Sequence, residues 1–66
     1  MSDQMIRAIA RSQECSIKEA RESLTEEIFY LRTLRKKQDL RYTDLQDVCG
    51  GLGIDDDYIP HLIAMI

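Results

Sequence analysis

Apolar residues recur along most of this chain at steps of three and four, the spacing of one face of an α-helix. The longest series predicts a helix over residues 17–37. The positions of this face are Ile17, Ala20, Leu24, Ile28, Leu31 and then Leu34 or Arg35. Ser16 is followed three residues later by Glu19, the sequence pattern of a capping box. The long helix is therefore expected to begin directly after Ser16.

One shorter helix is predicted before the long helix and another after it. Before it, Ser2 can cap a first helix, with an apolar stripe of Met5, Ile6 and Ile9. After it, the segment 43–46 repeats the capping pattern and predicts a third helix that begins near Asp44. Gly50 and Gly51 are expected to end this third helix, because glycine permits the left-handed backbone found at helix ends.

A fourth helix is predicted at the end of the sequence. Asp55 can cap it, and Pro60 falls in or beside its first turn, where a missing amide costs little. Its apolar positions are Ile59, Leu62, Ile63 and Ile66. The pattern as a whole predicts an all-α fold, a small bundle of about four helices in a single domain over residues 1–66.

Composition narrows the class of protein. The 66 residues are 44% hydrophobic and 32% charged, with a formal net charge of −3, typical of a small acidic globular domain. The net charge disfavours non-specific binding to nucleic acid or anionic membranes. Cys15 and Cys49 are too few for a disulfide framework, and neither a signal peptide nor a membrane-spanning run is indicated. We therefore expect a cytoplasmic protein with reduced thiols, with a single disulfide between Cys15 and Cys49 as the alternative.

The titratable residues form no pattern that indicates catalysis or metal binding. Asp55, Asp56 and Asp57 lack the further oxygen ligands of a calcium loop, so we interpret them as helix-capping residues. His61 follows Asp57 by four residues, which is typical of a surface pair. No nucleophile–base pair can be named. We expect no enzymatic activity, no metal and no cofactor.

From Leu31 onward the sequence resembles the Cro and lambda-repressor-like helix-turn-helix family. The matching positions are Leu34-Arg35-Lys36-Lys37, Leu40, Thr43-Asp44-Leu45, Gly53-Ile54, Tyr58-Ile59 and Leu62. This resemblance implies a transcription regulator that binds DNA. The chain departs from the family in three places. Residues 50–52 resemble an insertion between the motif helices, and three aspartates at the start of the recognition helix would repel phosphate. Pro60 stands where the resemblance implies a side chain that reads or positions the DNA.

The pattern favours a small regulatory protein that acts by protein–protein interaction, as a homodimer, with helix-turn-helix DNA binding as the alternative. A short domain buries more apolar surface when it pairs with a second copy of itself. The candidate interface residues are apolar: Ile28, Phe29, Leu31, Ile63 and Ile66. The candidate recognition residues are charged: Arg32, Arg35, Lys36, Lys37, Arg41, Asp55, Asp56 and Asp57.

Overall fold

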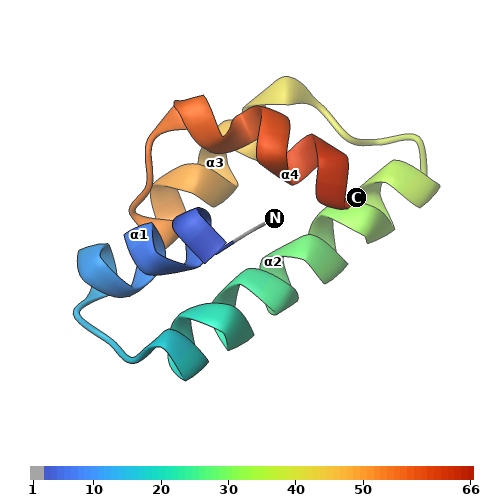
Figure 1. The fold of residues 1–66 in the computed structure, drawn as a ribbon. Helices are drawn as coiled ribbons and strands as arrows, with labels where there is room; N and C mark the ends of the chain where they lie inside the picture. Colours follow the sequence, from blue (N-terminus) through green and yellow to red (C-terminus); the bar gives the residue numbers. More distant parts are fainter. Residues whose placement is uncertain (1–2) are drawn as a thin grey trace.

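Residues 3–66, the part of the chain that this computed structural model describes, contain four α-helices and one short 3₁₀ helix (Figure 1). They are α1 (Asp3–Gln13), α2 (Ile17–Lys36), α3 (Tyr42–Leu52), η1 (Asp56–Tyr58) and α4 (Ile59–Met65). The prediction of an all-α bundle with one long helix is confirmed. The expected cap at Ser2 lies outside the described residues.

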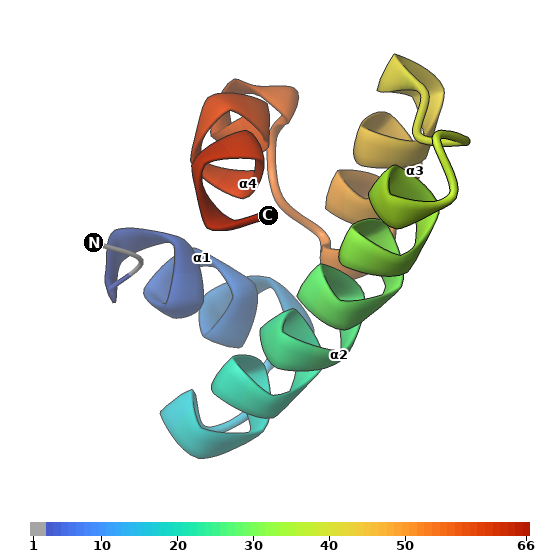
Figure 2. The same ribbon diagram turned by 90° about the vertical axis from the view of Figure 1, so that its right-hand side faces the viewer.

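The long helix α2 runs along one side of the molecule, and the other three helices lie over it (Figures 1 and 2). Helix α1 packs against α2, and α3 packs against both of them. Fourteen buried apolar residues form the core between the helices: Met5, Ile6, Ile9, Ala10, Ala20, Leu24, Ile28, Leu31, Leu45, Val48, Cys49, Leu52, Ile59 and Leu62. Because every helix supplies part of this core, burial of their apolar faces holds the bundle together.

Helix α2 begins where the sequence predicts, with a complete capping box. The Glu19 amide donates to Ser16 Oγ at 3.1 Å, and the Ser16 amide donates to Glu19 Oε1 at 3.2 Å. The helix ends at Lys36, one residue before the predicted end. Ile17, which the pattern placed on the apolar face, is 45% exposed and lies outside the core. The first turn of α2 is therefore held by its cap and by the buried Ala20, and Ile17 adds nothing to the core.

Replacing Ser16 by alanine is expected to destabilise the protein by about 1 kcal/mol. The Glu19 amide would lose its acceptor while the buried face of α2 stayed intact. A thermal melt should show a midpoint several degrees lower than that of the parent protein, since about 4–8 °C accompanies each kcal/mol in a domain of this size. An unchanged midpoint would show that the box contributes nothing to stability.

Helix α3 differs from its prediction at both ends. It begins at Tyr42 rather than near Asp44, and the Arg41 amide donates to Asp44 Oδ2 at 2.8 Å. The capping box predicted over residues 43–46 is wrong, because Asp44 already lies inside the first turn. Gly50 and Gly51 continue the helix to Leu52. Residues 50–52 are thus the last turn of α3 and do not form an insertion in the turn that follows.

Gly53 ends α3 in the left-handed conformation, with φ of 73°. Its amide and that of Ile54 donate to the last carbonyls of the helix, at Gly50 and Cys49. Glycine is favoured here for two reasons: other residues rarely adopt this φ, and a Cβ would lie 3.0 Å from Ser12 Cβ and still closer to Ser12 Oγ. The α3–α4 turn therefore packs directly on the end of α1.

The chain enters α4 through a single 3₁₀ turn. Asp55 caps this turn, since its Oδ1 accepts from the Asp57 amide at 3.0 Å. Pro60 stands in the first turn of α4, as predicted. Ile59 and Leu62 are buried, whereas Ile63 is 52% exposed, so only part of the predicted apolar face enters the core.

Candidate interaction surface

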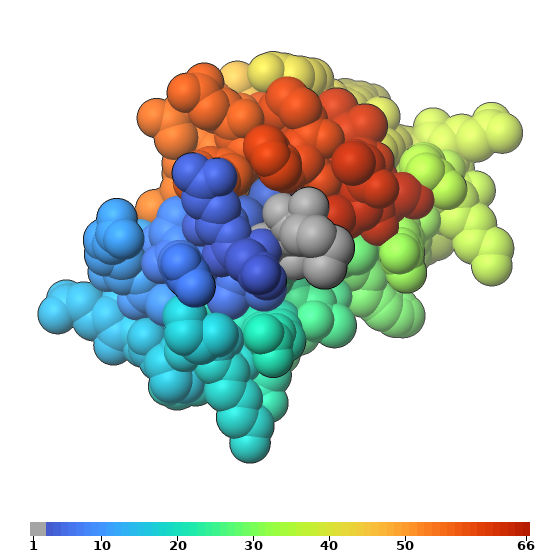
Figure 3. All heavy atoms as spheres, viewed as in Figure 1, coloured from blue at the N-terminus to red at the C-terminus, as the bar shows by residue number. Residues whose placement is uncertain are grey.

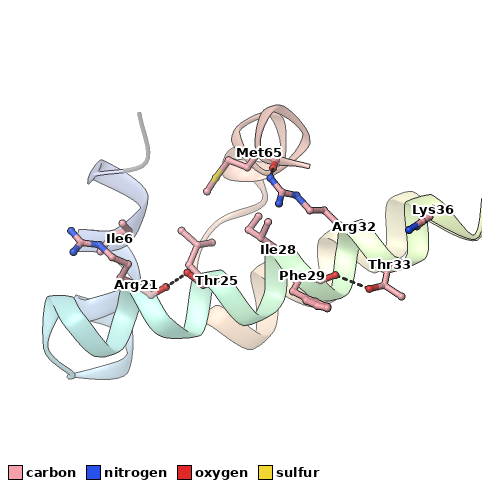
Figure 4. A pocket seen from close by; sticks show the side chains of 10 residues that line it. Ile6, Arg21, Thr25, Ile28, Phe29, Arg32, Thr33, Lys36 and Met65 are labelled. Carbon is pink, nitrogen blue, oxygen red and sulfur yellow. Dashed lines mark hydrogen bonds between the residues drawn. The ribbon is translucent and has the colours of Figure 1, made fainter.

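A groove with a volume of about 790 Å³ follows one face of α2 (Figure 4). Eight of its lining residues come from α2, and α1 and α4 each supply one. Among residues 3–66, the lining residues are Ile6, Arg21, Leu24, Thr25, Ile28, Phe29, Arg32, Thr33, Lys36 and Met65. The space-filling view shows the side of the molecule on which α1 and α4 lie above α2 (Figure 3). The groove is thus built from three helices, with α2 as its base.

The middle of the groove is apolar. Leu24 and Ile28 lie beneath it and are almost fully buried, at 3% and 8% exposure. Ile6 of α1 and Met65 of α4 provide further apolar surface (Figure 4). Phe29 stands at the edge and is 63% exposed, an unusual state for so large an apolar side chain. A ligand that covered Phe29 would gain the free energy of burying apolar surface.

The charged residues that line the groove all have the same sign. Arg21, Arg32 and Lys36 are cations, and no carboxylate stands among the described lining residues. The chain as a whole carries a net charge of −3. The groove is therefore a basic surface on an acidic protein, and its local charge, not the net charge, decides which ligands it attracts.

Hydrogen bonds hold three of the polar side chains that line the groove. Arg32 Nη2 donates to the Met65 carbonyl at 2.9 Å and so joins α2 to the C-terminal end of α4 (Figure 4). A cation is favourable there, because free carbonyls give a helix end a partial negative charge. The hydroxyls of Thr25 and Thr33 donate to carbonyls one turn earlier in α2, at 2.8 and 2.9 Å. These donors are satisfied within the protein, so a ligand need not supply acceptors for them.

The five apolar interface candidates occupy different environments. Leu31 is fully buried within the chain, and Ile28 is 8% exposed, so Leu31 presents no surface to a partner and Ile28 only a small one. Phe29 lies at the groove and Ile63 on the outside of α4, and both are exposed. Ile66 is half-buried against the core. The spacing that predicted Leu31 as an interface residue instead reflects the chain's own core.

The basic candidates are also divided by the fold. Arg32 and Lys36 line the groove, whereas Arg35, Lys37 and Arg41 are exposed outside its lining. Arg21, the third cation of the groove, was not among the predicted residues. It lies eleven residues before Arg32, on the same face of α2. This spacing was visible in the sequence, but nothing there showed that α1 and α4 leave that face open.

The acidic and thiol residues form no site of their own. Asp55 caps η1, and Asp56 Oδ2 accepts from Gln46 Nε2 at 3.4 Å, while within residues 3–66 no group of side chains could hold a metal ion. Cys49 is a core thiol: burial raises its pKa above the usual value, and the charges of Asp56 and Asp55 raise it further. A thiol with a raised pKa is a poor nucleophile.

Tyr58 and His61 lie close together on the turn into α4. Their ring centroids are 5.7 Å apart and the planes are tilted by 55°. The predicted pairing of His61 with Asp57 stays a prediction.

None of the described helices combines the length and apolarity required to cross a membrane. No protein-family model, curated protein sequence or solved structure matches this chain.

Proposed function

We propose that this protein is a small, non-enzymatic regulator that acts in the cytoplasm by binding another protein. The observation that carries the proposal is the groove on α2, in which an apolar floor and an exposed phenylalanine lie between three cations. Apolar surface supplies affinity, and charges beside it supply orientation and selectivity. Proteins commonly receive an amphipathic helix of a partner in an apolar groove.

The distribution of charge favours a protein ligand over DNA. In a helix-turn-helix regulator, the start of α4 would approach the phosphates, and in this chain Asp55, Asp56 and Asp57 stand there. Carboxylates beside phosphate would weaken DNA binding. The cations Arg21, Arg32 and Lys36 instead surround apolar side chains, a poor match for a phosphate backbone.

The protein-binding function can be tested with a photoreactive amino acid placed in the groove. Thr33 lines the groove, and Lys18 is an exposed residue of α2 outside its lining, so Lys18 serves as the matched control. In the native cytoplasm, irradiation should produce a discrete adduct with another protein from position 33 and none from position 18. Adducts from neither position, together with salt-dependent retention of the protein on a DNA column, would favour the DNA-binding alternative.

We further propose that the protein is a homodimer, with its interface on α4. Ile63 is 52% exposed there, and Ile66 is half-buried beside it. The groove is a poor interface between two copies. A twofold dimer brings the same patch of each subunit together, so Arg21, Arg32 and Lys36 would meet cations of the second copy. Separate surfaces would then serve the dimer and the partner.

Replacing Ile63 by glutamate is expected to produce a folded monomer. The side chain is half exposed, so its loss should cost little core packing, but a buried charge at an interface is strongly unfavourable. Sedimentation should show a dimer for the parent and half its mass for the variant, and only the parent should have a melting temperature that rises with concentration. Ala64→Glu adds the same charge at the next exposed residue and should remain dimeric. A parent protein that sediments as a monomer would rule out the proposed dimer.

A further inference from the structure

We propose that the segment bound in the groove is an acidic, amphipathic α-helix of about four turns, contributed by a different protein. This inference rests on the proposed function and specifies the chemistry of the partner. Its basis is the length of the groove, the position of its apolar floor and the spacing of its three cations along α2.

The length of the groove sets the length of the occupant. Arg21 and Lys36 mark its two ends on α2. At about 1.5 Å per residue, the fifteen steps between them correspond to roughly 22 Å, or about four helical turns. A partner helix of about 15 residues would therefore cover the lining from end to end.

The chemistry of the groove favours a helix over an extended segment. A strand in the groove would leave its amides and carbonyls without partners over the apolar floor, because residues 3–66 contain no β-strand to pair with them. A helix satisfies these groups internally and needs only an apolar stripe. Leucine-like residues at helical spacing would cover Leu24, Ile28 and Phe29, and Met65 would close one side.

The spacing of the cations specifies where the carboxylates of the partner lie. Arg32 and Lys36 are one turn apart on α2, so they match acidic residues four apart on the partner. Arg21 lies three turns before Arg32 and matches an acidic residue near the other end of the partner helix. The contact of Arg32 with the Met65 carbonyl occupies one of the five N–H donors of its guanidinium, so the others can reach a carboxylate.

The test uses two synthetic peptides of about 16 residues, each with a leucine stripe at helical spacing. One carries glutamates beside the stripe at the positions that match the three cations, and the other carries lysines at the same positions. Binding of fluorescently labelled peptide is measured by anisotropy, and the contacted residues are found from backbone amide chemical shifts.

Three forms of the protein are compared: the parent, the groove variant Arg21→Glu/Lys36→Glu, and the control Lys18→Glu/Lys37→Glu. The control makes the same change in charge on exposed residues outside the lining. The parent and the control should bind the glutamate peptide, with shifts around Thr25 and Thr33 and an affinity that falls as salt is added. The groove variant should bind it at least about tenfold more weakly and should prefer the lysine peptide.

Three results would overturn the inference. They are equal binding of both peptides by the parent, equal loss of affinity in the groove variant and the control, or no binding of either peptide. Binding of DNA or of anionic vesicles that is lost in the groove variant, without peptide binding, would also contradict it. The two proposals can fail separately. If position 33 forms a protein adduct but neither peptide binds, the proposed protein-binding function stands and only the acidic helix is rejected.

Discussion

Leu31→Ala is expected to lower the free energy of unfolding by about 2–5 kcal/mol, the usual cost of replacing a buried leucine by alanine. The side chain is fully buried in the core. A domain of this size rarely has more than about 3–5 kcal/mol of stability, so a large fraction of the variant should be unfolded at room temperature. Circular dichroism should show loss of helical signal, and urea titration should show little or no folded baseline.

Phe29→Ala is the matched control for this prediction. Phe29 lies two residues earlier on α2 but is 63% exposed, so its removal should change the free energy of unfolding by no more than about 0.5 kcal/mol. The pair separates a core position from a surface position on one helix. If Leu31→Ala melted like the parent while dimerisation was lost, Leu31 would belong to an interface and the described packing of α2 would be wrong.

Gly53→Ala is expected to destabilise the protein by about 2–5 kcal/mol. A left-handed conformation costs an ordinary residue about 1–2 kcal/mol, and forcing extra volume into a packed site costs about 1–3 kcal/mol. Both costs apply at Gly53, which has φ of 73° and faces the side chain of Ser12. Chemical denaturation of the variant should show a midpoint well below that of the parent.

Gly51→Ala, two residues earlier, is expected to have the opposite effect and to stabilise the protein. Gly51 lies inside α3, and a Cβ added there meets nothing within 4 Å. Alanine should therefore stabilise the helix by about 0.5–1 kcal/mol. Destabilisation by Gly51→Ala would show that α3 ends before Gly51, as its glycines suggested from the sequence, and stabilisation by Gly53→Ala would show that Gly53 is not the residue that terminates it.

Local chemistry was sufficient to predict most of the fold. The start of α2 was predictable because Ser16 and Glu19 satisfy each other's backbone within four residues. The start of α3 was misplaced because the sequence offers two overlapping starts. The predicted start used the capping pattern that begins at Thr43, a residue that often caps helices. In the structure the helix begins two residues earlier, where Asp44 accepts from the amide of Arg41, a residue with no capping preference.

The groove could be predicted only in part. The sequence showed that Phe29 gives α2 more apolar surface than one face requires, and it identified Arg32 and Lys36 as candidates. Which apolar residues remain exposed depends on how α1 and α4 lie on α2, and that is a property of the tertiary structure. Leu31 was therefore assigned to an interface although the other helices cover it, and Arg21 was missed.

The measurement that tests the central claim most directly compares the reactivity of Lys36 and Lys37 toward an amine-acylating reagent. Both are exposed at the end of α2, but only Lys36 lines the groove. In native lysate, relative to purified protein, mass spectrometry should show slower acylation of Lys36, with Lys37 and the distant Lys18 unchanged. Equal rates at Lys36 in lysate and in purified protein, or protection centred on Lys18, would contradict the account.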